Sequence, residues 1–167
     1  MPIGHIGLNT PDLEKMHKFY LAALKPLGYV QKLEFADGLV RGYGPQYCAP
    51  DFWLSSTKLA KSQDGKVDQS GTGFLHLAFS ARTRNQVRAF YDAAIAAGAT
   101  CNGPPGPRPQ YFFTYYGAFV LDPEGRNIEA VCMKPAFWGE EWGWGLYFTL
   151  IGTLFAAAAW WFERIPL

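Results

Sequence analysis

Cysteine, histidine and charged residues are all scarce in this chain of 167 residues. Cys48, Cys101 and Cys132 are widely spaced and form no C-x-x-C motif, which fits free thiols in a reducing compartment better than a disulfide framework. The net charge is +1 without a lysine or arginine cluster, so nucleic-acid binding is not expected. No basic segment precedes an apolar run at the N-terminus, and a secretory signal is therefore not expected.

An internal repeat is the most informative feature that is present. His5 opens the run His5-Ile6-Gly7-Leu8, and His76 opens the run His76-Leu77-Ala78-Phe79 at an offset of 71 residues. Four more identities recur at this offset: Phe19, Tyr20, Ala22 and Ala23 match Phe90, Tyr91, Ala93 and Ala94. A repeat of this length indicates a duplicated supersecondary unit within one domain of ordinary size.

The first module is expected to be a strand, a helix and three further strands. Alternation of side chains predicts a strand over 3–9, and apolar residues at helical spacing predict a helix over 12–24. Turn residues then separate strands at about 29–35, 38–43 and 51–56. The polar, glycine-bearing stretch 58–73 has no apolar period and is expected to link the modules.

The second module repeats this order. A strand over 75–80 precedes a helix that a capping box at Thr83 and Gln86 begins and Gly98 ends. Residues 103–109 include four prolines and are expected to form a stiff loop without regular structure. Strands over 115–121 and 127–133 flank a proline–glycine turn. The predicted fold class is therefore α+β, with two tandem βαβββ modules over about 3–57 and 74–133.

Two histidines and one glutamate form the candidate metal-ligand set. His5 and His76 hold equivalent repeat positions, so a two-fold relation between the modules would bring them to one site. Glu129 lies between apolar neighbours on a strand, where an inward carboxylate is unfavourable unless a positive group pairs with it. Such ligands suit zinc, iron(II), nickel or manganese, and we predict that the three side chains converge. Alternatively, the histidines are ordinary strand residues and Glu129 faces water.

Several motifs together resemble the vicinal oxygen chelate superfamily, the group of glyoxalase I, bleomycin-resistance proteins and extradiol dioxygenases. They are the paired histidines, the proline-rich segment 103–109, the run Tyr115-Tyr116-Gly117-Ala118-Phe119 and the run Asp122-Pro123-Glu124-Gly125 followed by Asn127-Ile128-Glu129. The similarity covers about residues 3–133. It implies a cupped mixed sheet with the site inside and metal ligands at His5, His76 and Glu129.

One position departs from the pattern of this family. Glyoxalase I enzymes carry a fourth ligand, a glutamate, on the last strand of the first module. Its nearest counterpart here is Trp53, with Asp51 two residues earlier, and an indole cannot bind a metal or act as a general base. We therefore expect Trp53 close to the metal position, in a pocket that is more aromatic than in glyoxalase I.

Three further positions are candidate substrate contacts. Arg108 in the stiff loop is suited to hold a carboxylate or another anion in a bidentate contact. Phe112 or Phe113 stands where relatives with this loop often carry a histidine. Tyr115 and Tyr116 are neighbours on a strand and point to opposite faces, so at most one of them, here Tyr115, lines the cup.

Residues 135–167 form a tail after the domain of residues 1–134. Residues 145–162 carry no charge, and as a helix they would be about 27 Å long, close to the hydrocarbon thickness of a bilayer. Tryptophans flank both ends of this stretch, as in interfacial belts. We therefore predict a single-pass transmembrane anchor with the domain on the cytosolic side. The alternatives are a helix packed on the domain or on a dimer partner, and a cytoplasmic protein.

The leading functional hypothesis is a metal-dependent, glyoxalase-like enzyme for a small oxygenated or aromatic molecule. The metal would chelate neighbouring oxygens and stabilise an enolate-like intermediate, and Glu129 is the candidate catalytic group. Isomerase, lyase and dioxygenase chemistry stay open, as does a homodimer. The second hypothesis is a metal-free protein that binds and sequesters a small molecule, as in drug resistance. The third is a membrane-tethered scaffold with a vestigial cup.

Overall fold

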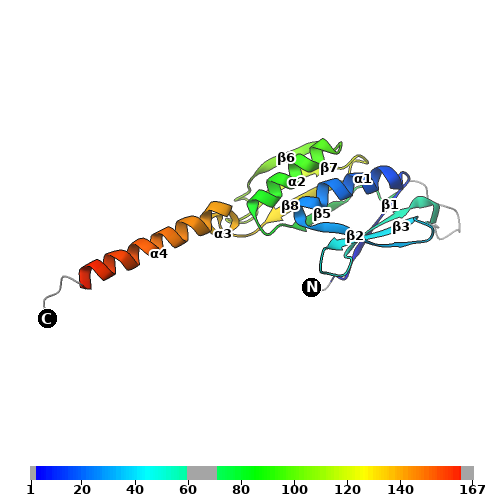
Figure 1. The fold of residues 1–167 in the computed structure, drawn as a ribbon. Coiled ribbons are helices and arrows are strands. Elements are labelled where there is room, and N and C mark those ends of the chain that lie inside the picture. Colours follow the sequence, from blue (N-terminus) through cyan, green and yellow to red (C-terminus); the bar gives the residue numbers. More distant parts are fainter. Residues whose placement is uncertain (1–2, 60–70, 163–167) are drawn as a thin grey trace.

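The computed structural model describes residues 3–59 and 71–162, so most of the predicted linker 58–73 lies outside the described residues. Two modules share the order strand, helix and three strands (Figure 1). The first comprises β1 (Ile6–Thr10), α1 (Leu13–Leu24), the short helix η1 (Lys25–Leu27), β2 (Tyr29–Phe35), β3 (Val40–Pro45), β4 (Phe52–Ser56) and the short helix η2 (Thr57–Leu59). The second comprises β5 (His76–Ser80), α2 (Arg84–Ala96), β6 (Thr100–Pro107), β7 (Tyr116–Leu121) and β8 (Asn127–Cys132).

Each module builds its own four-stranded mixed sheet. The strand orders are β1-β4-β3-β2 and β5-β8-β7-β6. In both sheets the first strand runs parallel to the last strand of its module, and the other pairs are antiparallel. The predicted α+β fold of tandem βαβββ modules is therefore confirmed.

Both helices begin at a side-chain cap, and the cap of α2 is the predicted Thr83. The Asp12 side chain accepts a hydrogen bond from the Lys15 amide, and the Thr83 hydroxyl accepts one from the Gln86 amide, so both caps satisfy a free N–H group of the first turn. The apolar stripe of each helix is buried against the sheets. The buried residues are Leu13, Met16, Phe19, Tyr20, Ala23 and Leu24 in α1, and Val87, Phe90 and Ala94 in α2.

One hydrophobic core joins the modules, with α1 and α2 side by side near its centre (Figure 1). Phe79 on β5 is one of the contacts between the two halves. Its ring centre lies 5.5 Å from that of Phe52 on β4 and 5.4 Å from that of Tyr29 on β2, both edge to face. Burial of these large rings contributes strongly to holding the modules together.

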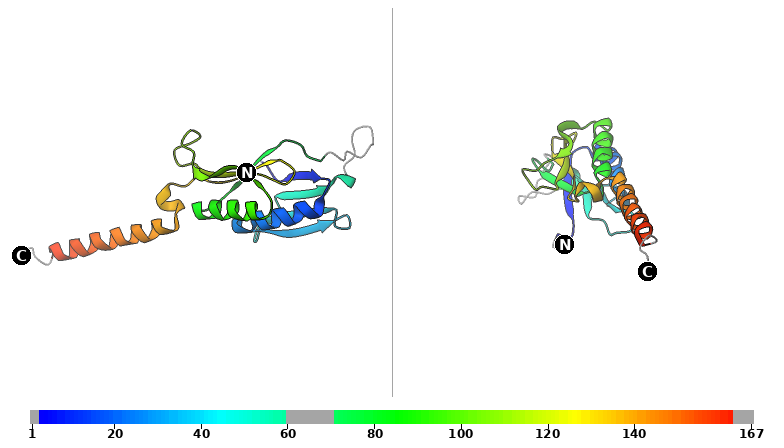
Figure 2. Two further views of the ribbon diagram at one scale, coloured as in Figure 1. Left: turned by 90° about the horizontal axis from the view of Figure 1, so that it is seen from above. Right: turned by 90° about the vertical axis from the view of Figure 1, so that its left-hand side faces the viewer.

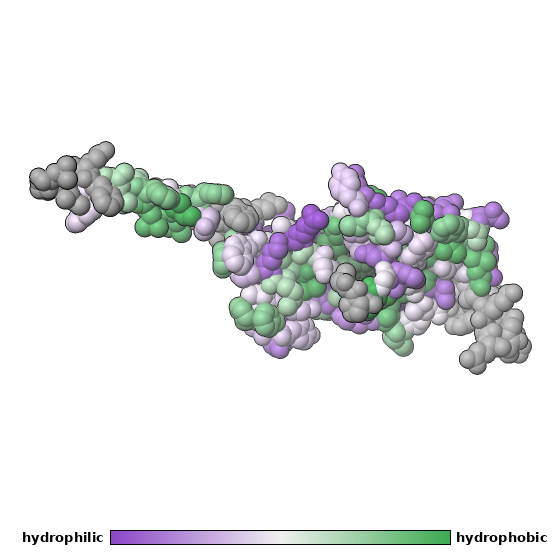
Figure 3. Space-filling view, turned by 90° about the horizontal axis from the view of Figure 1, so that it is seen from below, coloured by the Kyte–Doolittle hydropathy of each residue, from purple (hydrophilic) through white to green (hydrophobic). Residues whose placement is uncertain are grey.

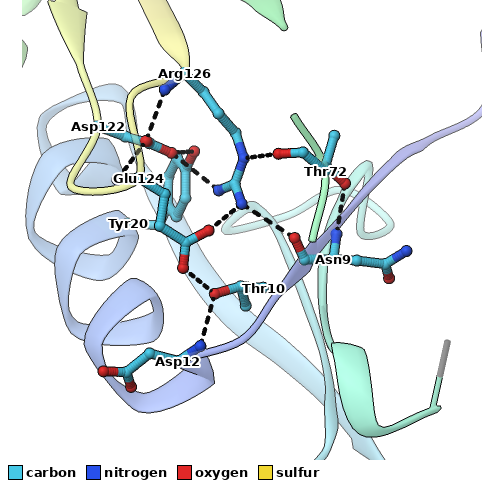
Figure 4. Close-up of polar contacts among 8 residues, drawn as sticks. All are labelled: Asn9, Thr10, Asp12, Tyr20, Thr72, Asp122, Glu124 and Arg126. Atoms are coloured by element: carbon cyan, nitrogen blue, oxygen red, sulfur yellow. Dashed lines mark hydrogen bonds and ion pairs between the residues drawn. The ribbon is translucent and has the colours of Figure 1, made fainter. Parts of the chain in front are cut away.

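A buried polar cluster around Arg126 adds a second joint between the modules (Figure 4). Arg126 is 1% exposed, and its guanidinium pairs with the Asp122 carboxylate at 3.0 Å. The same guanidinium donates to the Asn9 carbonyl of the first module and to the Thr72 carbonyl that precedes β5. The Tyr20 hydroxyl of α1 donates to Asp122 at 2.8 Å. The buried charges are therefore paired and hydrogen-bonded across the module boundary, as burial requires.

The proline-rich segment 103–109 is not a loop throughout, contrary to the expectation, because β6 extends to Pro107. β6 is an edge strand, and among the described strands it pairs with β7 alone. Prolines are tolerated at a sheet edge because no neighbouring strand needs their missing N–H groups. Register shifts after Cys101 and after Gly103 interrupt the pairing and accommodate the prolines.

The tail contains the short helix α3 (Ala136–Gly139) and the predicted long helix, α4 (Glu141–Phe162). Glu140 between them forms a 2.8 Å ion pair with Arg88 of α2. From there α4 projects away from the modules (Figures 1 and 2), and a space-filling view shows hydrophobic side chains along it (Figure 3). Large apolar side chains such as Leu154 and Phe155 are about 70% exposed, at 69% and 73%.

The predicted transmembrane anchor over 145–162 is wrong. In the described parts of the chain, no helix combines the length and the apolarity needed to span a bilayer. The physical reason is that the absence of charge is not the same as strong apolarity. Glycine, threonine, alanine, tyrosine and tryptophan make up most of this stretch, and its leucine, isoleucine and phenylalanine residues each contribute only about 0.3–0.6 kcal/mol to transfer into the bilayer.

Candidate functional site

A histidine and a buried carboxylate meet on the second sheet. His76 begins β5, and Glu129 lies in the middle of the adjacent parallel strand β8, where it pairs in register with Ala78. His76 Nε2 lies 3.0 Å from Glu129 Oε2. The side chain of Glu129 is 1% exposed, whereas that of His76 is 51% exposed. The pair therefore joins a buried anion to a group that solvent or a ligand can reach.

Tyr115 and Gly117 hold the carboxylate in this place. The Tyr115 hydroxyl donates to Glu129 Oε1 at 2.5 Å. Burial and this hydrogen bond raise the pKa of the Tyr115 hydroxyl well above its usual range, so the phenol remains a donor. A Cβ atom at Gly117 would lie 2.9 Å from Oε1, so only glycine leaves room for the carboxylate beside β7. The buried charge is thus stabilised by donors on two sides.

Two asparagines orient the imidazole ring. Asn102 donates to the Oδ1 atom of Asn127 at 3.0 Å, and the Nδ2 atom of Asn127 faces His76 Nδ1. Because an amide nitrogen is a donor, Nδ1 accepts, and the ring proton lies on Nε2, which donates to Glu129. A chain of hydrogen bonds therefore runs from Asn102 through Asn127, His76 and Glu129 to Tyr115.

These groups line a cavity of about 540 Å³. Arg108 stands at its wall with the guanidinium carbon 5.7 Å from the ring centre of Phe119, and His76 stacks on the same ring at 6.1 Å. The cavity is lined by His76, Asn102, Gly103, Arg108, Tyr111, Tyr115, Phe119, Asn127 and Glu129. A volume of this size fits a small molecule.

The structure brings together four of the residues singled out from the sequence and separates the others. His76, Glu129, Arg108 and Tyr115 share this cavity, whereas Phe112 is not among its lining residues. Phe112 is 47% exposed and packs on Phe113, with ring centres 4.5 Å apart.

Sequence reasoning missed Asn127, Asn102 and Tyr111. Asn127 had a usable signal, because it precedes Glu129 by two residues on a strand and so shares its face. Asn102 had no such signal, because the segment that follows it was expected to be irregular. Tyr111 had none either, because it lies in the turn after β6, where side chains follow no periodicity.

His5 and Trp53 form the counterpart of this site in the first module. Trp53 pairs in register with Gly7, two residues after His5, as Glu129 pairs with Ala78, two residues after His76. Trp53 therefore holds the position equivalent to Glu129. Its ring lies 6.3 Å from that of His5, and it stacks on Phe35 at 5.9 Å. This face of the first sheet is aromatic where the second sheet carries a carboxylate.

The predicted convergence of His5, His76 and Glu129 does not occur within one chain. His5 lines a different cavity of about 350 Å³, together with Asp51 and Arg82. Across residues 3–59 and 71–162, no three His, Cys, Asp or Glu side chains lie close enough together to hold a metal ion. The reason is that β1 and β5 belong to separate sheets. His76 and Glu129 are suitable donors for a divalent ion, but they provide only part of a donor set.

Comparisons with known proteins agree with this architecture. The model of the Glyoxalase/Bleomycin resistance protein/Dioxygenase superfamily matches residues 2–130. A glyoxalase/bleomycin resistance protein from Albidiferax ferrireducens is similar in structure, with 30% identity, a TM-score of 0.59 and coverage of 79% of this chain and 98% of that chain. No curated protein matches the sequence significantly.

Two further solved structures share the fold at lower identity. A glyoxalase/bleomycin resistance protein/dioxygenase family enzyme from Burkholderia phytofirmans has 21% identity and a TM-score of 0.58, over 80% of this chain and 100% of that chain. A glyoxalase-related enzyme from Fulvimarina pelagi has 20% identity and a TM-score of 0.60, over 79% and 88%. The family match ends at residue 130, before α3 and α4. The chain belongs to the glyoxalase/bleomycin resistance protein/dioxygenase superfamily.

Proposed function

We propose that this chain is a metal-dependent, glyoxalase-like enzyme whose site is shared between two copies. His76 and Glu129 of one copy provide two ligands, and His5 of the second copy provides the third. One observation carries the proposal: a histidine and a buried carboxylate meet in an open cavity at 3.0 Å. The equivalent histidine lies at a separate cavity of the same chain, so a second copy is needed to supply it.

The donor types suit zinc, iron(II), nickel or manganese, because these ions accept imidazole nitrogen and carboxylate oxygen. Members of the superfamily commonly bind a divalent metal. When bound, such an ion supplies Lewis-acid polarisation of neighbouring oxygens on a small substrate. Catalytic zinc sites typically have three protein ligands, which is the number that His76, Glu129 and a second copy's His5 provide.

The surrounding residues have separate tasks in this proposal. Tyr115 occupies Oε1 of Glu129, which leaves Oε2 to bind the ion or to accept a proton from the substrate. Asn127 contacts Nδ1 of His76, which leaves Nε2 to face the ligand. When Nε2 binds the ion, the ring proton would lie on Nδ1, and the Asn127 amide would turn so that its oxygen accepts this proton, as an outer hydrogen-bond partner of a metal-bound histidine does. Trp53 of the second copy would approach with His5 and form an aromatic wall, which favours an aromatic or apolar substrate.

A complementation experiment tests the shared site. His5→Ala and His76→Ala proteins each lack one ligand in both sites of a homodimer, so neither is expected to retain metal. In a mixed dimer, the His5→Ala copy keeps His76 and Glu129, and its partner keeps His5. One intact site per dimer should therefore return, and elemental analysis of the tagged heterodimer should recover about half of the metal of the wild type.

Two controls make the result decisive. Mixing His76→Ala with Glu129→Gln should restore nothing, because both changes fall on the same half of the site. Native mass spectrometry confirms that the heterodimer forms. Metal retained by His5→Ala alone, or no recovery in a verified heterodimer of His5→Ala and His76→Ala, would contradict the shared site.

The second candidate function is metal-free binding of a small aromatic molecule. Trp53 supports it, because an indole stands at the position equivalent to Glu129 and aromatic surfaces bind flat ligands without a metal. Binding of an aromatic compound that persists unchanged in Glu129→Gln and after chelation would favour this function over metal-dependent catalysis.

A further inference from the structure

Arg108 is held in the cavity by its own strand. Its Nη1 group donates to the Pro107 carbonyl at 3.1 Å, and its Nη2 group donates to the Pro104 carbonyl at 2.7 Å. Its backbone amide donates to the Tyr115 carbonyl at 2.8 Å. The guanidinium is therefore folded back along β6, and the remaining N–H groups of the five that arginine carries are free for another acceptor.

Two glycines make the space that this arrangement needs. A Cβ atom at Gly106 would lie 2.9 Å from Arg108 Nη1, and one at Gly103 would lie 3.0 Å from Phe119 Cδ2 and 3.5 Å from Arg108 Nη2. A side chain at Gly106 would push the guanidinium out of its place. The proline–glycine sequence of β6 thus positions the arginine and is not merely a stiff connection.

Among the described residues, the charge of Arg108 has no carboxylate partner. Within residues 3–59 and 71–162, the arginines Arg41, Arg88 and Arg126 each form an ion pair with a carboxylate, whereas Arg108 forms none. The two carboxylate oxygens of Glu129 in the same cavity contact His76 and Tyr115. A preorganised guanidinium without a carboxylate partner is suited to hold an anion from outside the chain.

We propose that Arg108 binds the carboxylate of a small aromatic acid whose opposite end lies at His76 and Glu129. Arg108 and His76 are both within about 6 Å of the Phe119 ring centre, at 5.7 and 6.1 Å, so the two ends of the ligand are close together. The rings of Phe119, Tyr111 and Tyr115 supply the walls for one aromatic ring. This inference rests on the proposed function for the location of the site and adds the class of the substrate.

Calorimetric titration of the full chain with 4-hydroxybenzoate and its neutral isostere 4-hydroxybenzamide tests this inference. The wild type should prefer the acid, because a bidentate charge-assisted contact exists only for the carboxylate. Arg108→Gln should weaken binding of the acid about tenfold or more while it leaves binding of the amide unchanged. The affinity of Arg108→Lys for the acid should lie between those of the wild type and Arg108→Gln, since lysine keeps the charge and loses the planar fork.

Two further variants and one condition test whether the position of the Arg108 guanidinium, and not another arginine or a metal, causes the preference for the acid. Gly106→Ala should reproduce most of the loss with Arg108 still present, because the added methyl group displaces the guanidinium. Arg82→Gln, which removes an exposed arginine at the other cavity, should bind both probes as the wild type does. All titrations are repeated after chelation, so the acid preference is measured without a metal and its outcome is separate from that of the shared-site experiment. Equal affinity of the wild type for acid and amide, or an unchanged acid preference in a folded Arg108→Gln protein, would overturn the inference.

Discussion

At the scale of single residues, Glu129 is the position where burial and charge oppose each other most strongly. Its side chain is 1% exposed, yet two neighbours keep it in place without a lysine or arginine: the Tyr115 hydroxyl on one oxygen and His76 on the other. A carboxylate stabilised by neutral donors keeps a larger share of its negative charge available for a cation than one paired with arginine. This is the property that a metal ligand needs.

Tyr115→Phe should therefore weaken both stability and metal binding. Loss of a hydrogen bond to a charged group is expected to lower the free energy of unfolding by about 1.5–3 kcal/mol, measured by urea denaturation. Tyr111→Phe is the matched control, because Tyr111 lines the same cavity and its hydroxyl does not bond to Glu129. Equal stability of the two variants would show that the contact between Tyr115 and Glu129 contributes little.

At the scale of secondary-structure elements, β6 and α4 differ in how far they belong to the domain. β6 is an edge strand that carries Asn102 and leads into Arg108, so its irregular pairing directly shapes the cavity. None of the described side chains of α4 belongs to the buried core, and the segment before it contacts α2 through the ion pair between Glu140 and Arg88. Strand β6 is thus part of the site, and helix α4 is an appendage to the domain.

A chain that ends at Gly139 should consequently fold as the full chain does. The truncation removes α4 and the ion pair between Glu140 and Arg88, and a pair of this kind contributes up to about 1 kcal/mol. Urea denaturation should give the truncated chain and the full-length Glu140→Gln variant the same free energy of unfolding within error. A loss in the truncated chain that greatly exceeds the loss in Glu140→Gln would mean that α4 stabilises the domain by contacts of its own.

At the scale of the whole molecule, the buried cluster around Arg126 ties the two modules together (Figure 4). Arg126→Gln leaves the Asp122 carboxylate without its buried cationic partner, and such changes destabilise by about 3–5 kcal/mol. Arg41→Gln, which removes ion pairs with the exposed Glu14 and Glu34, should cost no more than about 1 kcal/mol. The urea midpoints of both variants measure this contrast, and similar midpoints would refute the role of Arg126 as a joint.

The same cluster makes stability depend on alkaline pH through Tyr20. Burial and the Asp122 carboxylate raise the pKa of the Tyr20 hydroxyl well above its usual range. Unfolded chains ionise tyrosine near pH 10, so above that pH the unfolded state releases a proton that the folded state retains. Stability gained from this group is therefore present below about pH 10 and is lost as the pH rises.

Tyr20→Phe removes this ionisation, so the free energy of unfolding of the variant should depend less on pH than that of the wild type. The difference in free energy of unfolding between the wild type and Tyr20→Phe is expected to narrow from pH 9 to pH 11, measured by urea denaturation at each pH. Tyr47→Phe is the control, because Tyr47 is 93% exposed, and its curve should run parallel to that of the wild type. A constant difference for Tyr20→Phe across this range would contradict the argument.

Local pattern and repetition determined much of the architecture from the sequence alone. The offset of 71 residues between His5 and His76, the capping box at Thr83 and the turn after Leu121 placed both modules. These signals are local, because strand alternation and helix capping depend on neighbours within a few residues. The resemblance to glyoxalase I also singled out Trp53, at the place of the missing fourth ligand, and the strand register puts this residue at the position equivalent to Glu129.

Only the tertiary structure decided which of these residues meet. His5 and His76 are equivalent in sequence, but His5 precedes β1 and His76 begins β5, and these strands belong to separate sheets. One chain therefore assembles His76 with Glu129 and leaves His5 at another cavity. The buried cluster around Arg126 and the chain of hydrogen bonds through Asn102 and Asn127 likewise link residues that are far apart in the chain. Contacts of this kind depend on how modules pack in space, and no local periodicity encodes the distance between two sheets.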